Sequence, residues 1–274
     1  MNKKTLCCAF GASYYRYTLP MLQSFFRYHS PADWRVVIGD VGLEHWQREE
    51  LGAFGEVRQY PPSPAICISG ISWPAARARL QMMADLITEG GVVLYLDSDI
   101  LVFGSVELFI AEFVASGKPI AMTLENTPHF FETKARESWV NSEIPPEFTH
   151  QDEWRELPMV NGGVIFTQGL EGARVCRLAL GLYDSYTPKL QFAEQSALCT
   201  VIYELKIPFL PVPLKYNCVV FERYIDHKWT SGFKMPVPYR DTVPIYNRER
   251  VVIRHFGGHG KENYKRLLDI AILT

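Results

Sequence analysis

The stretch VVLYLDSDILV, residues 92–102, decides the fold class that this sequence predicts. It follows a pair of glycines, and its only charged side chains are Asp97 and Asp99. A short apolar run bounded by turn residues predicts a strand that is buried on both faces, as in parallel sheets covered by helices. Asp97 and Asp99 then stand at the carboxyl end of the strand, which is where open α/β sheets bind their ligands.

Strand-like and helical patterns alternate on both sides of this stretch. Apolar strand-like runs occupy residues 6–10, 35–38, 56–60, 120–123, 163–166 and 251–255, and helical patterns occupy residues 18–28, 44–51, 75–87, 173–183 and 193–204. Neither an internal repeat nor a low-complexity linker divides the chain. This alternation is typical of an α/β fold with a mostly parallel central sheet flanked by helices. We therefore expect one domain over residues 1–274.

The composition excludes several classes of protein. Because 47% of its 274 residues are hydrophobic, the chain can build a core and is neither disordered nor fibrous. Its 28 basic and 30 acidic residues give a net charge of −2, which argues against nucleic-acid binding, since that needs clustered positive charge. No apolar run reaches the ~20 residues of a transmembrane helix. The six cysteines lack CxxC spacing, so we expect buried thiols in a cytoplasmic protein.

Asp97 and Asp99 are spaced i, i+2, which places both carboxylates on the same side of an extended backbone. Two like charges at such short range repel, and a cation between them removes the repulsion. Hard divalent ions that also hold phosphate oxygens are commonly bound by one or two carboxylates. The pair therefore indicates either a metal site or a solvated turn after the strand.

Several segments resemble, in the same order, the motifs of the family 8 retaining glycosyltransferases, which include glycogenin and bacterial lipopolysaccharide galactosyl- and glucosyltransferases. The matching segments are ARL at 78–80, VLYLDSDILV at 93–102, NGGVIF at 161–166, EQSAL at 194–198, YN at 216–217 and HFGGHGK at 255–261. Each motif alone is weak, but together they span most of the chain. The resemblance implies a GT-A fold, with a Rossmann-like domain that binds a nucleotide sugar.

The resemblance also implies a metal site and a donor. Mn²⁺ (or Mg²⁺) would be held by Asp97, Asp99 and His255 together with the diphosphate of a nucleotide sugar, for which the family implies a UDP-hexose. An imidazole is a suitable further ligand for such an ion. The alternative for His255 is a hydrogen-bonded histidine at a sheet edge.

Further donor contacts follow from the same resemblance. The implied donor-binding residues are Phe10, Gly11, Ala12 and Tyr14 for the base and ribose, and Arg79, Ser98, Asn161, Gly162, Gly258 and Lys261 for the sugar and diphosphate. The chain departs from the family by lacking the usual acidic residue near Phe10, and by having Glu262-Asn263 where Pro-Trp is usual. Each of these residues also has an ordinary structural explanation, such as a surface arginine at position 79 or a turn former at position 161.

The same resemblance implies that three residues act on the reacting atoms. Glu194 would bind hydroxyls of the transferred sugar, Gln195 would face its anomeric carbon, and Lys261 would share the charge of the leaving diphosphate. Glu194 stands where the family has Asp, so the sugar site is expected to be reshaped. The alternative for Glu194 is a helix first-turn acid. Because no carboxylate in these motifs is an obvious nucleophile, the resemblance implies front-face substitution with retained configuration.

Two other functions fit parts of the pattern. A haloacid-dehalogenase-type phosphatase also has Asp-x-Asp after a strand, but there the motif follows the first strand. A catalytically silent nucleotide-sugar-binding subunit would keep the fold without turnover.

The acceptor is expected to be a saccharide, bound beside an insertion or lid at residues 125–158. The aromatic and imidazole side chains of this segment fit an acceptor platform and a small hydrophobic core equally well: His129, Phe130, Phe131, Trp139, Phe148 and Trp154.

Residues 264–273 combine two basic side chains with an apolar run, which predicts at most weak contact with the inner face of a membrane.

Overall fold

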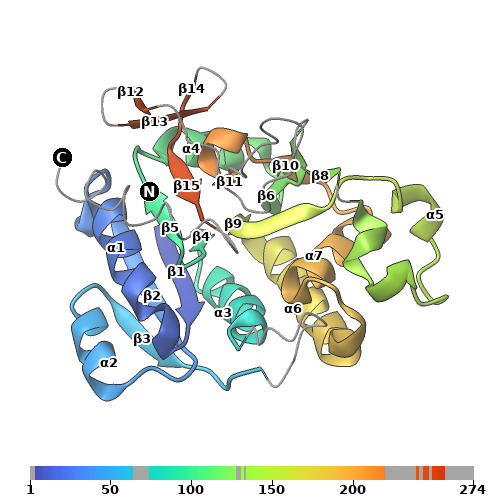
Figure 1. Ribbon diagram of the computed structural model, residues 1–274, viewed down its shortest axis with the longest axis horizontal. Helices are drawn as coiled ribbons and strands as arrows, with labels where there is room; N and C mark the ends of the chain where they lie inside the picture. Colours follow the sequence, from blue (N-terminus) through green and yellow to red (C-terminus); the bar gives the residue numbers. More distant parts are fainter. Residues whose placement is uncertain are drawn as a thin grey trace, which may run out of the picture.

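The computed structural model describes residues 4–63, 74–127, 131–132, 134–219, 239–240, 243–246 and 249–256. Its centre is a seven-stranded sheet with the strand order β10-β6-β9-β4-β1-β2-β3 (Figure 1). These strands are β1 (Lys4–Phe10), β2 (Trp34–Asp40), β3 (Glu56–Gln59), β4 (Val92–Leu96), β6 (Ile120–Leu124), β9 (Val160–Gln168) and β10 (Phe209–Pro211).

The sheet is mostly parallel, as the sequence predicts. Strands β4, β1, β2 and β3 run parallel to one another, and β10 runs parallel to β6. Strand β9 is the exception, because it runs antiparallel to both β4 and β6. Its start therefore lies beside the carboxyl end of β4, with Val164 paired to Leu96, and this brings Asn161 and Gly162 to the edge that carries Asp97.

Helices cover both faces of the sheet (Figure 1). They are α1 (Tyr15–Phe26), α2 (His45–Gly52), α3 (Ala76–Thr88), α4 (Glu107–Ser116), α5 (Gln151–Trp154), α6 (Gly169–Tyr186) and α7 (Ala193–Glu204). Alternate residues of β1 point to opposite faces: Cys7 and Ala9 join a core with α3, α6 and α7, whereas Leu6, Cys8 and Phe10 join a core with α1 and α4. Both faces are therefore apolar, as a helix-covered sheet requires.

The expected elements occur with small shifts at their ends, and two of them, β4 and α7, have the predicted bounds. Helix α4 and strand β5 (Ile100–Val102) were not predicted. Strand β5 pairs antiparallel with β15 (Ile253–His255), which pairs parallel with β11 (Cys218–Val219) in a second, three-stranded sheet. Asp97, Ser98 and Asp99 form the turn between β4 and β5, so the extended backbone expected for the two acids is wrong.

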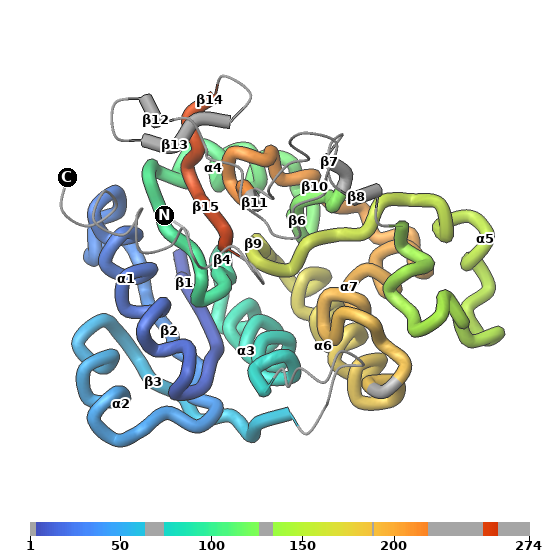
Figure 2. The backbone as a smooth tube through the Cα atoms, viewed as in Figure 1, coloured from blue at the N-terminus to red at the C-terminus, as the bar shows by residue number. Residues whose placement is uncertain are grey.

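Part of the 125–158 segment packs against α7 (Figure 2). Trp139 and Trp154 are each 1% exposed. Their indole N–H groups donate to Thr200 Oγ1 at 3.2 Å and to Glu204 Oε2 at 3.0 Å, and Phe148 lies 5.3 Å from Trp139 between ring centres. These side chains form a hydrophobic core, which decides against the platform for the two tryptophans. His129, Phe130 and the side chain of Phe131 lie outside the described residues.

Short elements complete the described chain. They are the strands β7 (Asn126–Thr127), β8 (Phe131–Glu132), β12 (Tyr239–Arg240), β13 (Val243–Tyr246) and β14 (Glu249–Arg250), and the 3-10 turns at Ala12–Tyr14, Pro31–Asp33, Ala135–Ser138, Val140–Ser142, Thr187–Lys189 and Leu214–Tyr216.

Five cysteines are free and buried, as predicted, and Cys67 lies outside the described residues. Among the helices of the described ranges, none combines the length and apolar character needed to cross a membrane.

Candidate metal and donor site

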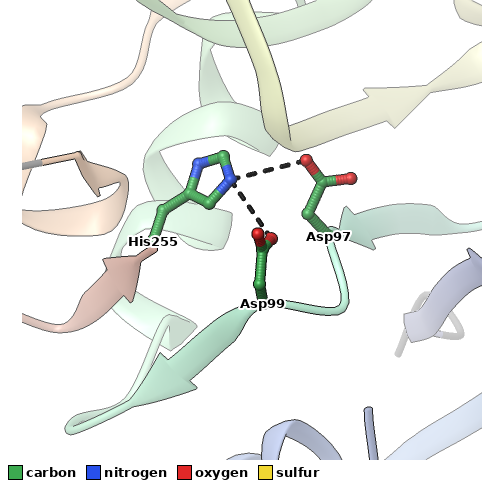
Figure 3. A group of neighbouring side chains, drawn as sticks. All are labelled: Asp97, Asp99 and His255. Atoms are coloured by element: carbon green, nitrogen blue, oxygen red, sulfur yellow. Dashed lines mark ion pairs between the residues drawn. The ribbon is translucent and has the colours of Figure 1, made fainter. Parts of the chain in front are cut away.

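Asp97, Asp99 and His255 meet at the carboxyl edge of the sheet (Figure 3). Each offers one ligand atom, and these atoms all lie within 4.8 Å of one another. Nε2 of His255 lies 3.5 Å from Oδ2 of Asp97 and 3.5 Å from Oδ1 of Asp99. The structure thus brings together residues that are far apart in the sequence.

The backbone around His255 explains this convergence. Strand β15 places His255 opposite Ile100, next to the turn that carries both acids. The N–H of Phe256 donates to the carbonyl of Asp99 at 2.9 Å, and the N–H of Asp97 donates to the carbonyl of Gly163 at 2.9 Å. A Cβ atom on Gly163 would overlap Cε1 and Nδ1 of the His255 ring. Glycine at position 163 is therefore what leaves space for the imidazole.

The charges of this cluster suit a divalent cation. Burial lowers the pKa of His255, but hydrogen bonding to Asp99 and the charges of Asp99 and Asp97 outweigh it and raise the pKa above its usual value. The two carboxylates therefore favour a positive charge at this position. Two hard carboxylate oxygens and one imidazole nitrogen form a donor set that fits Mn²⁺ or Mg²⁺.

Arg79, on α3, forms the second part of the site. Its guanidinium donates to Asp97 Oδ1 and to the carbonyl of Gly162 at 3.1 Å, and pairs with Glu194. It also lies 4.4 Å above the ring of Tyr95, whose hydroxyl donates to Asp97 at 3.2 Å. Arg79 is 6% exposed. Burial works against its charge, but Asp97 and Glu194 raise its pKa, so the guanidinium stays protonated.

Glu194 and Gln195 lie in the first turn of α7 and face this cluster. Glu194 is 1% exposed, and burial raises its pKa while Arg79 lowers it. Its Oε2 atom has no hydrogen-bond donor among the described residues. The amide oxygen of Gln195 accepts the N–H of Gly162 at 2.8 Å. The two residues therefore reach the edge where Asp97 lies, on the side of β9.

Two site residues were missed by sequence reasoning: Glu125 and Asn217. Glu125 Oε1 accepts N–H groups from Asn161 at 2.9 Å and from Gln195 at 3.1 Å. Asn217 donates to Asn161 Oδ1 at 2.8 Å, and its own Oδ1 lies 3.1 Å from Nδ1 of His255. Asn217 belongs to the YN motif, but the motif did not indicate what its side chain contacts. Nothing in the sequence singled out Glu125.

The residues expected at the base and ribose lie at the end of β1 and directly after it. The side chain of Phe10 is 2% exposed and belongs to the core, so only its backbone can reach a ligand. The next residues at this sheet edge are Gly11, Ala12 and Tyr14, and the side chain of Tyr14 is 39% exposed. The N–H of Ala12 donates to the carbonyl of Gly42 at 3.3 Å. Gly258 and Lys261 lie outside the described residues, as does the 264–273 tail.

Solved structures with a similar fold were found, whereas no protein-family model and no curated protein matches the sequence. The galactosyltransferase LgtC, solved with donor and acceptor sugar analogues, shares 16% identity at a TM-score of 0.62, over 97% of this chain and 95% of that chain. The bifunctional glycosyltransferase WbbM shares 12% identity at a TM-score of 0.66, over 100% of this chain and 50% of that chain. Mouse xyloside xylosyltransferase 1 shares 16% identity at a TM-score of 0.52, over 92% and 96%.

These likenesses concern the fold. Together with the seven-stranded, mostly parallel sheet, they show that this chain has the GT-A fold that the sequence motifs predict. The Asp97–Asp99–His255 cluster lies at the carboxyl edge of this sheet, where open α/β folds bind their ligands.

Proposed function

We propose that this protein is a metal-dependent glycosyltransferase of family 8 that moves a hexose from a nucleotide-diphosphate sugar, UDP-hexose in the first instance, to a saccharide acceptor. The observation that carries the proposal is the cluster of Asp97, Asp99 and His255 at the carboxyl edge of a GT-A fold. The order of the sequence motifs and the names of the structural neighbours support it.

The donor would lie across the carboxyl ends of β1 and β4. A bound Mn²⁺ or Mg²⁺ would supply Lewis-acid stabilisation of the departing diphosphate. Asp97, Asp99 and His255 would hold that ion, and Gly11, Ala12 and Tyr14 would contact the nucleoside. Ser98, Gly258 and Lys261 would contact the diphosphate, with Lys261 sharing its developing negative charge.

The sugar would lie against the first turn of α7 and the start of β9. Arg79 orients two acids at once, because one guanidinium contacts both Asp97 and Glu194. This leaves Oε2 of Glu194 as a buried acceptor for a sugar hydroxyl. Asn161 and Gly162 line the same edge on β9.

Gln195 would face the anomeric carbon. An amide is a poor nucleophile, and that of Gln195 is already hydrogen-bonded to Gly162 and Glu125. We therefore propose front-face substitution with retained configuration, in which a diphosphate oxygen assists deprotonation of the acceptor hydroxyl.

Residues 125–158 would lie on the acceptor side of one domain that spans the chain. We place the enzyme in the cytoplasm, with at most weak contact at the inner face of the membrane.

Donor hydrolysis with and without Mn²⁺ tests this function. A panel of nucleotide sugars is first screened by thermal shift, and the donor that stabilises the chain is then assayed for release of the nucleoside diphosphate. The expected result is Mn²⁺-dependent release, with an α-anomer product by NMR from an α-linked donor. Release of phosphate from simple monoesters would instead identify a phosphatase, and binding without turnover a silent subunit.

A further inference from the structure

A continuous series of hydrogen-bonded side chains leads from Glu125 to His255. It runs from Glu125 through Asn161 and Asn217 to the Nδ1 atom of His255, with distances of 2.9, 2.8 and 3.1 Å. Asn217 is fully buried, and His255 is 6% exposed. In such surroundings each donor needs an acceptor, because an unpaired buried polar group is costly.

One backbone group fixes the direction of the whole series. The N–H of Gly163 can only donate, and it lies 2.9 Å from one side-chain atom of Asn161, which must therefore be the oxygen. That oxygen also faces Asn217, so Asn217 must present its NH₂ group there. The oxygen of Asn217 is then left facing Nδ1 of His255, and Nδ1 must carry a hydrogen.

We propose that Asn217 is a positioning residue that holds His255 in the tautomer with its hydrogen on Nδ1. The lone pair of Nε2 in the neutral ring then points toward Asp97 and Asp99, ready to bind a cation. This inference rests on the proposed metal-dependent function. Without Asn217 the preference would reverse, because the carboxylates of Asp97 and Asp99, 3.5 Å from Nε2, would favour a hydrogen on that nitrogen.

The far end of the series joins the metal ligand to the reaction centre. Glu125 Oε1 accepts N–H groups from both Asn161 and Gln195, and the oxygen of Gln195 accepts the N–H of Gly162. Glu125 therefore positions Gln195 and, through Asn161, the residue that orients His255. Since only an acceptor oxygen is needed at this point, glutamine can replace Glu125 in this role.

The tautomer is measured directly by long-range ¹H–¹⁵N NMR of the metal-free chain with labelled histidine, at alkaline pH where the ring is neutral. The seven histidines give seven ring patterns, and His255→Gln identifies the one that belongs to His255. We expect the Nδ1–H pattern in the wild-type chain. An Nε2–H pattern there would overturn the proposal without any variant, and would leave the proposed transferase function standing.

Two substitutions of similar size separate positioning from packing. Asn217→Leu removes the acceptor, so we expect the ring to change to the Nε2–H form. Asn217→Asp keeps an acceptor oxygen, so the Nδ1–H form should remain. A Leu variant that keeps the Nδ1–H form would overturn the role of Asn217. If the Leu variant does not fold, the wild-type spectrum and the Asp variant still decide, since loss of the Nδ1–H form in either contradicts the proposal.

Metal affinity gives a second readout that does not require turnover. Loss of a partner that orients a metal-binding histidine typically lowers metal affinity by about 10–100-fold. We expect this loss for Asn217→Leu, measured by electron paramagnetic resonance of free Mn²⁺ without donor. For Glu125→Gln we expect Mn²⁺ affinity within about twofold of wild type, since the carbonyl replaces the carboxylate oxygen as acceptor. Equal losses in both variants would contradict the series. If the wild-type chain binds no Mn²⁺ even when a nucleoside diphosphate is added, that result would instead refute the metal-dependent function.

Discussion

Two groups of charged residues in this molecule both pair arginine with acidic side chains but differ in burial. The site group consists of Arg79, Asp97, Asp99, Glu194 and His255, whose side chains are 1–20% exposed. The edge group consists of Arg35, Glu56, Arg58 and Glu89 at the β2–β3 side of the sheet, whose side chains are 21–45% exposed. Both groups pair guanidinium with carboxylate.

The two groups differ in charge balance as well as in burial. In the edge group each carboxylate contacts two arginines and solvent, so charges are balanced and screened. In the site group one guanidinium contacts Asp97 and Glu194, while Asp99 faces His255, so acidic groups are in excess within a low-dielectric region. Such an excess attracts a cation, and it makes the guanidinium of Arg79 costly to remove.

The largest expected effect comes from Asp99→Ala. We expect transfer to fall by more than about 100-fold, since even loss of an outer partner of a metal ligand costs about 10–100-fold. Thermal stability should change little, because the substitution also relieves repulsion between Asp97 and Asp99. Donor-hydrolysis rates at saturating Mn²⁺ measure the effect. Glu56→Ala, an acid of the edge group, is the matched control and should keep its activity; near-normal turnover of Asp99→Ala would refute its assignment.

The next effect concerns the space beside His255. Gly163→Ala introduces a Cβ atom where the imidazole lies, so the ring must move away from Asp97 and Asn217. We expect a loss of Mn²⁺ affinity of about 10–100-fold, measured by titration of the metal-free chain. In Gly104→Ala the new atom would lie 3.5 Å from Val252, an ordinary contact, so affinity should be retained. Equal affinities of the two variants would show that the ring position is not critical.

A third effect compares the arginines of the two groups by stability. Arg79→Leu leaves Asp97 and Glu194 buried without their cation, and breaking a buried pair costs about 3–5 kcal/mol. Urea unfolding of the metal-free chain measures this loss. Arg79→Lys keeps the charge but not the planar fork, so its loss should be smaller. If Arg79→Leu lost no more free energy of unfolding than Arg58→Ala, the difference in burial would have no energetic consequence.

The smallest effect belongs to the edge group itself. Arg58→Ala should cost about 0.2–1 kcal/mol, as for exposed ion pairs. Hydrogen bonds from Arg58 and Arg35 lower the pKa of Glu56 from 4.5 to about 2. A lowered pKa in the folded state contributes stability above pH 4.5 that is lost as the pH falls through about 2. Acid titration of unfolding should show a shallower loss in this range for Arg58→Ala. An unchanged acid slope would show that Glu56 does not depend on Arg58.

The sequence predicted the sheet and the three clustered residues but not the contacts that connect them. Apolar runs such as residues 92–96 define buried strands by composition alone, and the motifs located Asp97, Asp99 and His255. Helix α4 was missed because its buried positions, such as Phe109 and Phe113, lie in an almost continuous apolar run. Exposed positions such as Leu108 are apolar too, which hides the helical period. Glu125 and Asn217 were missed as site residues because their roles depend on side chains from β9 and β15, which pair with other strands only in the folded chain.

The pairing of β15 with β5 has a consequence for the order in which the protein is synthesised. A nascent chain that has emerged as far as β9 and α7 already contains Asp97 and Asp99. His255, however, has not yet been translated. Capture of the proposed ion by all three side chains would therefore wait until β15 has emerged and paired with β5. A bound ion would then mark translation through residue 255, because a chain arrested before that residue has Asp97 and Asp99 but no histidine beside them.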